Sequence, residues 1–205
     1  MNSNKINNII FDLGGVLIDW NPKYVYLDIF KGNKKKMFWF FKNICTEKWN
    51  LNQDAGYSLD KATNELIKLH PKHKQYIKIY YDRWEEMLGG EIEKTVWILN
   101  KLIPQFNVYA LTNWSAETFP VALKKFSFLH SFRDIIVSGR EKLIKPDPKI
   151  FQLAIDRFKI KANETIFIDD NINNIISAKK TGFITHHFKN PKKLITDLNK
   201  KRIKI

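Results

Sequence analysis

The chain alternates between helical and strand patterns from Glu91 to its end, and this alternation constrains the fold more than any other feature. Helices are expected at 91–102, 117–126, 148–158, 172–180 and 191–200. Apolar strands are expected at 107–111, 134–137, 165–168 and 183–187, and a further strand at 8–11. Such alternation is typical of a parallel β-sheet with helices on both faces. The sequence therefore predicts an α/β fold with three layers, helix–sheet–helix.

Residues 19–88 follow the first strand and show a different pattern, in which one helix follows another. We expect helices at 24–30, 34–41, 46–51, 59–69 and 71–87, with turns at 19–22 and at Gly89-Gly90 and no strand between them. We therefore predict a core domain of residues 1–18 and 89–205 and an all-helical cap domain of residues 19–88. Such a cap stands over the carboxyl edge of the sheet, where it can exclude water from a reaction.

Asp12 comes directly after the first expected strand, Asn8-Ile9-Ile10-Phe11, and just before a loop that Gly14 and Gly15 allow to turn tightly. In an open α/β sheet, ligands bind at the carboxyl ends of the strands. Asp12 is therefore the first candidate for a catalytic residue.

Polar residues also follow other expected strands. Thr112 and Asn113 follow the second strand of the core, Asp169 and Asp170 follow the fourth, and Lys145 lies in the loop after the third. Each of these alone has an ordinary interpretation, since an Asp after a strand often caps a helix and the other residues are common in turns. Their joint occurrence at strand ends is more specific and indicates a functional site.

The chemistry of this set is that of a carboxylate that attacks phosphorus. A carboxylate nucleophile and a phosphate repel each other unless their charges are offset. Mg²⁺ held by Asp12 and the 169–170 pair offers that compensation, and adjacent carboxylates are unfavourable without a cation. Lys145 adds a positive charge, and the Thr112 hydroxyl and the Asn113 backbone N–H can donate hydrogen bonds to phosphoryl oxygens.

Four short motifs stand in a characteristic order: FDLGGV (11–16), ALTN (110–113), KPDP (145–148) and FIDDN (167–171). In order and spacing they resemble the haloacid dehalogenase-like hydrolase superfamily over nearly the whole chain. The resemblance implies a Rossmann-like core, a helical cap inserted after the first strand and a covalent intermediate on Asp12. It also implies that the Gly14 carbonyl faces a Mg²⁺ ion held by the acidic fourth motif.

Gly14 departs from the pattern of most phosphatases in this superfamily, which carry a second Asp there to protonate the leaving alcohol and then activate water. Three explanations compete: another group or water serves, the leaving group needs no protonation, or the reaction is not phosphoryl transfer. Dehalogenases of 2-haloacids also lack that Asp, because halide departs unprotonated, and they need no metal. The Asp169-Asp170 pair favours a metal and therefore a phosphatase. The chain most resembles a bacterial subgroup that includes a phosphatase of α-glucose 1-phosphate.

Two further acidic positions have open interpretations. Asp19 can reach back across the glycine loop and partly replace the missing acid, although a role in a turn or a helix cap is preferred. The segment 53–56, Gln-Asp-Ala-Gly, either dips toward the substrate or forms a plain turn between cap helices.

Composition decides which partners we expect. The net charge of +14 permits nonspecific attraction to phosphate, but Arg is scarce and Lys is spread throughout, which argues against a dedicated nucleic-acid site. The single cysteine, Cys45, excludes an internal disulfide. No apolar run approaches the ~20 residues that span a bilayer, and the N-terminus lacks a secretory pattern. We expect a cytoplasmic protein, monomeric or weakly dimeric, that binds neither specific nucleic acid nor membranes.

The sequence thus predicts a Mg²⁺-dependent phosphatase of a small phosphorylated metabolite, expected to be a sugar phosphate, that forms an aspartyl-phosphate on Asp12. The alternatives are a metal-independent 2-haloacid dehalogenase and a catalytically silent relative that binds a ligand or a protein. The expected site comprises catalytic residues (Asp12 and Lys145), substrate-binding residues (Thr112, Asn113 and Lys145) and metal-binding residues (Asp12, Gly14, Asp169 and Asp170).

Overall fold

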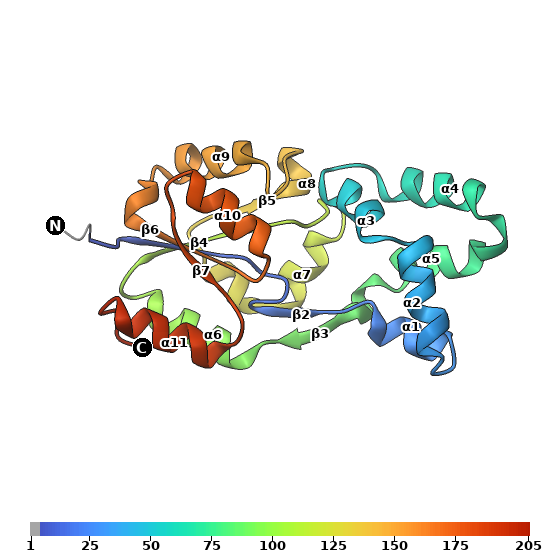
Figure 1. The fold of residues 1–205 in the computed structure, drawn as a ribbon, viewed down its shortest axis with the longest axis horizontal. Coiled ribbons are helices and arrows are strands. Elements are labelled where there is room, and N and C mark those ends of the chain that lie inside the picture. The colour runs from blue at the N-terminus through green and yellow to red at the C-terminus, as the bar shows by residue number, and fades with distance from the viewer. Residues whose placement is uncertain (1–4) are drawn as a thin grey trace.

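The core of the protein is a five-stranded parallel sheet with the strand order β5-β4-β1-β6-β7, seen in a computed structural model that describes residues 5–205 (Figure 1). The strands are β1 (Asn8–Phe11), β4 (Asn107–Thr112), β5 (Ile135–Val137), β6 (Thr165–Asp169) and β7 (Ile184–His187). β1 is central and pairs in parallel with β4 and β6. The predicted parallel sheet is confirmed, and the carboxyl ends of these three strands lie side by side.

Alternate side chains of β1 point to opposite faces of the sheet. Ile9 and Phe11 belong to one hydrophobic cluster and Ile10 belongs to the other, and all three are fully buried. A strand that is covered on both faces needs apolar residues at consecutive positions. This requirement explains the unbroken apolar run that precedes Asp12.

Helices cover both faces of this sheet. α9 (Pro148–Phe158) and α10 (Ile172–Lys180) lie on one face, and α6 (Glu93–Leu102) and α11 (Pro191–Lys200) lie on the other (Figure 1). Two shorter helices, α7 (Phe119–Lys125) and α8 (Ser138–Glu141), follow β4 and β5. The predicted three-layer, Rossmann-like α/β core is therefore confirmed. Within the described part of the chain, no helix combines the length and apolar character needed to cross a membrane.

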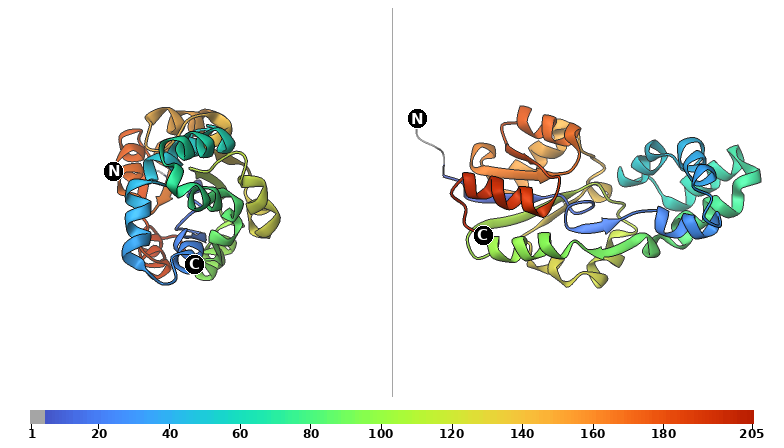
Figure 2. Two further views of the ribbon diagram at one scale, coloured as in Figure 1. Left: turned by 90° about the vertical axis from the view of Figure 1, so that its right-hand side faces the viewer. Right: turned by 60° about the horizontal axis from the view of Figure 1, so that its bottom comes forward.

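Residues 23–87 form a helical lobe, which we call the cap, beyond the carboxyl edge of the sheet (Figure 2). Aromatic rings fill its interior: the Tyr26 ring stacks on those of Phe30 and Phe40 and also meets Tyr80. The elements of the cap are α1 (Lys23–Ile29), α2 (Lys34–Asn43), α3 (Glu47–Asp54), α4 (Leu59–Leu69), α5 (Lys74–Asp82) and 3-10 helices at Pro71–His73 and Trp84–Met87.

Two strands join the cap to the core, and the sequence did not predict them. β2 (Ile18–Trp20) and β3 (Leu88–Glu91) pair antiparallel, where turns were predicted. Each strand is too short to show a clear alternation, and its partner lies at the other end of the cap. Both predicted domain boundaries, after residues 18 and 88, fall inside this pair of strands.

Several predicted helix boundaries are also wrong. The helix predicted at 46–51 extends to Asp54, and the one predicted at 34–41 extends to Asn43. The segment 71–87 is not one helix, because α5 ends at Asp82 and a 3-10 helix follows at Trp84–Met87. The helices predicted to begin at 91 and 117 begin at Glu93 and Phe119. At residue 91 the cause is β3, which takes Glu91 into its ladder with Ile18.

Candidate active site

Three strands deliver the predicted site residues to one edge of the sheet. Phe11, the last residue of β1, pairs with Ala110 on one side and with Ile168 on the other. Asp12 therefore lies between the end of β4, where Thr112 is buried, and the end of β6, where Asp169 is fully buried. The register of the sheet accounts for the meeting of residues that are far apart in the sequence.

Lys145 joins these strand ends from the loop before α9. Its side chain is buried, and its Nζ lies 2.9 Å from Asp12 Oδ1 and 2.7 Å from Asp169 Oδ2. Nζ also donates a hydrogen bond of 2.9 Å to the backbone carbonyl of Leu111 in β4. The ammonium is thus shared by the ends of all three strands, and a buried cation of this kind is stable only with such partners.

The Asn113 side chain forms hydrogen bonds with both backbone groups of Lys145. Its Oδ1 accepts a hydrogen bond of 2.9 Å from the Lys145 N–H, and its Nδ2 donates one of 2.9 Å to the Lys145 carbonyl. We expected Asn113 to contribute its backbone N–H, and the clamp on Lys145 was not predicted. The Asn113 side chain can bind the Lys145 backbone because the loop that carries Lys145 reaches the end of β4 only in the folded chain.

Asp169 is held by a residue that the sequence analysis missed. Asn174 Nδ2 lies 3.1 Å from Asp169 Oδ1 and 3.0 Å from Oδ2, and the Asn171 N–H donates to Oδ1 at 2.8 Å. Asn174 lies on the first turns of α10, directly after the acidic motif. A polar residue in the first turns of a helix that follows an acidic motif is the signal that would have identified it.

Asp170 lies on the exposed side of the same edge, against the glycine loop. A Cβ placed on Gly15 would lie 2.5 Å from Asp170 Oδ2, and Gly15 has a φ of +73°. Both the close approach and the left-handed backbone require glycine. The loop after Asp12 therefore allows a third carboxylate to come near.

Three carboxylates face one ammonium at this edge. Ligand atoms of Asp12, Asp169 and Asp170 all lie within 4.8 Å of one another. Burial has the largest effect on Asp12 and raises the pKa of its carboxyl to about 7; Lys145 lowers this pKa, and Asp169 raises it again. The excess of negative charge and the all-oxygen donor set fit a divalent cation such as Mg²⁺.

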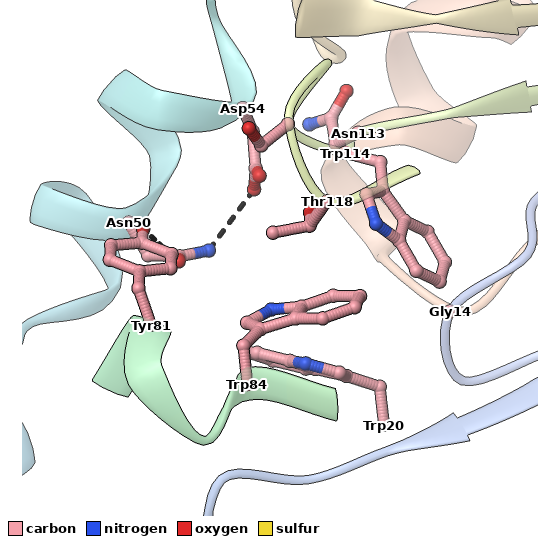
Figure 3. Close-up of a pocket in the computed structure, with 10 residues that line it drawn as sticks. Gly14, Trp20, Asn50, Asp54, Tyr81, Trp84, Asn113, Trp114 and Thr118 are labelled. Atoms are coloured by element: carbon pink, nitrogen blue, oxygen red, sulfur yellow. Dashed lines mark hydrogen bonds between the residues drawn. The ribbon is translucent and has the colours of Figure 1, made fainter. Parts of the chain in front are cut away.

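A cavity of about 80 Å³ lies between this edge and the cap (Figure 3). Gly14 lines its core side, and a Cβ placed there would find no atom within 4 Å. Asn50 and Asp54 of α3 line its cap side. The position at which the superfamily pattern has a second Asp is therefore open space in this protein.

Three indole rings wall this cavity, and sequence analysis assigned them no role. They belong to Trp20 of β2, Trp84 of the cap and Trp114 of the loop after β4. The rings of Trp84 and Trp114 meet edge to face, with centroids 5.6 Å apart. Within residues 5–205, Trp114 Nε1 and Thr118 Oγ1 are buried without a hydrogen-bond partner. The cavity therefore offers apolar faces together with polar groups that are available to a ligand.

Two acidic residues had open interpretations, Asp54 of the segment 53–56 and Asp19, and the structure places them differently. Figure 3 shows the Asp54 side chain pointing into the cavity, where its Oδ2 accepts a hydrogen bond of 3.1 Å from Asn50 Nδ2. Burial raises the pKa of the Asp54 carboxyl to about 7, and the Ser115 backbone amide lowers it. Asp19 instead accepts a hydrogen bond of 2.5 Å from the Tyr24 hydroxyl. Asp54 of the segment 53–56 thus lines the cavity as the last residue of α3, so this segment is only in part a turn between helices. Asp19 lies in strand β2 and pairs with a cap tyrosine, so the preferred turn or helix-cap role is wrong.

A family model and two curated proteins match most of the chain. The model is that of haloacid dehalogenase-like hydrolases, and it matches residues 9–188. The sesquiterpene phosphatase astK of Aspergillus oryzae is 27% identical over 179 residues, which are 87% of each protein. The pyrophosphatase PpaX of Halalkalibacterium halodurans is 28% identical over 191 residues, which are 88% of this chain and 82% of that protein.

A solved structure with bound magnesium has the same fold. It is the magnesium complex of BT-2542, an enzyme of the haloacid dehalogenase-like family from Bacteroides thetaiotaomicron. The two chains superpose with a TM-score of 0.71 and are 25% identical, over 90% of this chain and 94% of the other.

Proposed function

We propose that this chain, which belongs to the haloacid dehalogenase-like hydrolases, is a phosphatase of small phosphomonoesters that works through a covalent aspartyl-phosphate on Asp12. The similarity to two phosphatases along most of the chain supports this reaction class. The observation that carries the proposal is the network of Asp12, Lys145 and Asp169, because it holds a carboxylate at the open edge of the sheet with a cation beside it.

In this proposal each side chain has a distinct task. Asp12 attacks phosphorus with a carboxylate oxygen. Lys145 stays protonated between Asp12 and Asp169 and offsets the charge that the phosphate brings. The Thr112 hydroxyl and the Asn113 backbone N–H donate hydrogen bonds to the phosphoryl oxygens, while the Asn113 side chain keeps Lys145 in place.

The residues that would hold Mg²⁺ are Asp12, Asp169, Asp170 and the carbonyl of Gly14. Their carboxylate oxygens are close enough to share one ion. Both oxygens of Asp169 already accept hydrogen bonds, whereas Asp170 is exposed. When bound, Mg²⁺ would neutralise the carboxylates and polarise a phosphoryl oxygen. A metal site in BT-2542, which has a similar fold, supports this cofactor.

The cavity supports a sugar phosphate as the substrate. Indole rings of Trp20, Trp84 and Trp114 present flat apolar faces, against which the C–H groups of a sugar can lie. Trp114 Nε1–H and Thr118 Oγ1 lack partners within the described residues, and sugar hydroxyls can supply them.

Hydrolysis assays test this proposal directly. We expect turnover of para-nitrophenyl phosphate and of members of a sugar-phosphate panel with Mg²⁺, and its loss with a chelator. Asp12→Asn is expected to lower kcat by at least about 10⁴-fold, because the amide cannot act as the nucleophile. Asp156→Asn, an exposed aspartate of α9, is the matched control and is expected to retain activity.

Two outcomes would contradict the proposal. Metal-independent halide release from 2-haloacids, abolished by Asp12→Asn, would identify a dehalogenase instead. Stabilisation by phosphate without turnover of any phosphate ester, unchanged by Asp12→Asn, would identify a silent ligand-binding relative.

A further inference from the structure

We propose that Asp54 of the cap is the proton donor and acceptor that this site lacks at Gly14; the inference rests on the phosphatase function proposed above. In this role the Asp54 carboxyl protonates the leaving oxygen in the first half of the reaction. The resulting carboxylate then takes a proton from the water that attacks the aspartyl-phosphate.

Among the residues that the structure describes, Asp54 is the only carboxylate that lines the cavity beside Gly14. Within the described residues, the other groups around this cavity are indole, amide, hydroxyl and phenol side chains, with no Lys, Arg or His among them. Figure 3 shows Asp54 and Gly14 on opposite sides of the cavity. A leaving group placed between them is therefore within reach of one acidic group, directly or through one water.

Contacts between cap and core hold Asp54 in this position. Its backbone carbonyl accepts a hydrogen bond of 2.5 Å from the Ser138 hydroxyl, which in turn accepts one of 2.9 Å from the Trp114 N–H. A Cβ on Gly56 would lie 2.7 Å from the carbonyl oxygen of Gly139, so the end of α3 approaches the core closely. Asp54 is thus fixed to the loop that continues from Thr112 and Asn113.

The surroundings of Asp54 favour a carboxyl that can exchange a proton near neutral pH. Burial raises its pKa to about 7, and Asn50 and the Ser115 amide are its hydrogen-bond donors. Burial also raises the pKa values of Tyr80, Tyr81 and Cys45, so these neighbours are neutral at working pH. Lys23, Lys42 and Glu47 line an adjoining groove that Asp54 also lines, and Glu117 lies near the Tyr81 side chain.

Asp19, the competing candidate, is engaged elsewhere. Its carboxylate accepts the hydrogen bond of Tyr24, and its Oδ2 would lie 2.6 Å from a Cβ on Gly89. It does not line the cavity that Gly14 and Asp54 share.

The two halves of the reaction balance with Asp54 as the only proton carrier. In the first half, Asp12 forms a bond to phosphorus, the bond from phosphorus to the leaving oxygen breaks, and that oxygen takes its electron pair and the Asp54 proton. In the second half, water attacks phosphorus and passes one proton to Asp54. The bond from Asp12 to phosphorus breaks, and its electron pair returns to Asp12 as inorganic phosphate leaves.

Asp54→Asn tests the inference through its dependence on the leaving group. We expect kcat/KM for the best alkyl phosphate of the panel to fall by about 10²–10³-fold. We expect kcat/KM for para-nitrophenyl phosphate to change by less than about 5-fold, because para-nitrophenolate leaves without a proton. Water attack is slowed for both substrates, so the variant is expected to show a burst of para-nitrophenolate. Asp60→Asn, an exposed aspartate in the first turn of α4, is the control.

The pH profile gives a second measurement on the same protein. For the wild-type chain, kcat/KM for the alkyl phosphate is expected to fall as pH rises through about 7, and Asp54→Asn is expected to lose this limb. Equal losses for both phosphates, or an unchanged limb, would overturn the inference alone. A wild-type chain that hydrolyses only the aryl phosphate would also overturn it. A wild-type chain that hydrolyses neither would contradict the phosphatase function itself.

Discussion

Asp12 at the end of strand β1 and Asp54 at the end of cap helix α3 are alike in their pKa values but differ in the charges around them. Burial raises the pKa of both carboxyls to about 7. Asp12, however, lies 2.9 Å from the ammonium of Lys145 and close to two further carboxylates. Asp54 has an amide donor from Asn50, and no cationic side chain lines its cavity in the described part of the chain.

This difference indicates how one site can assign two tasks to the same functional group. At Asp12 the ammonium of Lys145 favours the charged carboxylate against the effect of burial, and a carboxylate is the form that attacks as a nucleophile. A carboxyl in an uncharged cavity keeps a proton that it can give away near neutral pH. In the proposed reaction the core thus supplies the charged nucleophile, and the cap supplies the proton.

Removal of the Lys145 ammonium beside Asp12 is expected to have the largest effect on the free energy of unfolding. Lys145→Met would leave Asp12 and Asp169 facing each other in the interior without compensation. We expect the free energy of unfolding to fall by about 3–5 kcal/mol in chelator at pH 8. The loss is expected to shrink toward pH 5, where the raised pKa lets Asp12 take up a proton.

Urea unfolding of the variant, the wild type and Lys149→Met measures this effect. Lys149 is an exposed lysine of α9, so its substitution is expected to change stability little. A loss for Lys145→Met no larger than that of the control would mean that the carboxylates do not depend on this ammonium.

Substitution of Asp54 in the cap is expected to have an intermediate effect on the free energy of unfolding, and this effect depends on pH. The folded-state pKa of Asp54 is raised above its ordinary value of 3.8, so the folded chain binds more protons than the unfolded chain between these values. Stability is therefore lost as pH rises from about 4 to about 7. Asp54→Asn removes this loss and is expected to stabilise the protein at pH 8 by on the order of 1–2 kcal/mol, a figure reduced for the partial exposure of the side chain.

Thermal or urea unfolding of wild type and Asp54→Asn at pH 4.5 and pH 8 isolates this contribution. The difference between the two proteins is expected to grow with pH. A difference in stability that stays constant with pH would mean that the pKa of Asp54 is not raised. The proposed contrast between Asp54 and Asp12 would then fail.

The smallest effect is expected from substitution of Asp19. Asp19 is a carboxylate near the cavity, whereas Asp54 is a carboxylate that lines it. Asp19→Asn weakens a hydrogen bond with Tyr24 at the joint between cap and core. We expect kcat/KM for alkyl and aryl phosphates to change by less than about threefold, because Asp19 does not line the cavity that Gly14 and Asp54 share. A selective loss with alkyl phosphates would transfer the proposed acid role from Asp54 to Asp19.

The core and the cap also differ in how far the sequence predicted them. Asp12, Thr112 and Asp169 each directly follow or end an apolar run, and such runs are local patterns that can be recognised without the fold. The helical nature of the cap was predictable for the same reason. The β2–β3 pair was not, because three or four residues carry too weak a pattern and their pairing spans the whole cap.

The sequence by itself thus determined the α/β core, the helical insertion and the order of polar residues at the strand ends. The tertiary structure alone decided that Asn113 and Asn174 hold Lys145 and Asp169, that three tryptophans wall a cavity beside Gly14, and that Asp54 rather than Asp19 points into it. The physical reason is the range of the interactions. Burial patterns repeat over a few residues, whereas the contacts between cap and core form only when distant segments pack together.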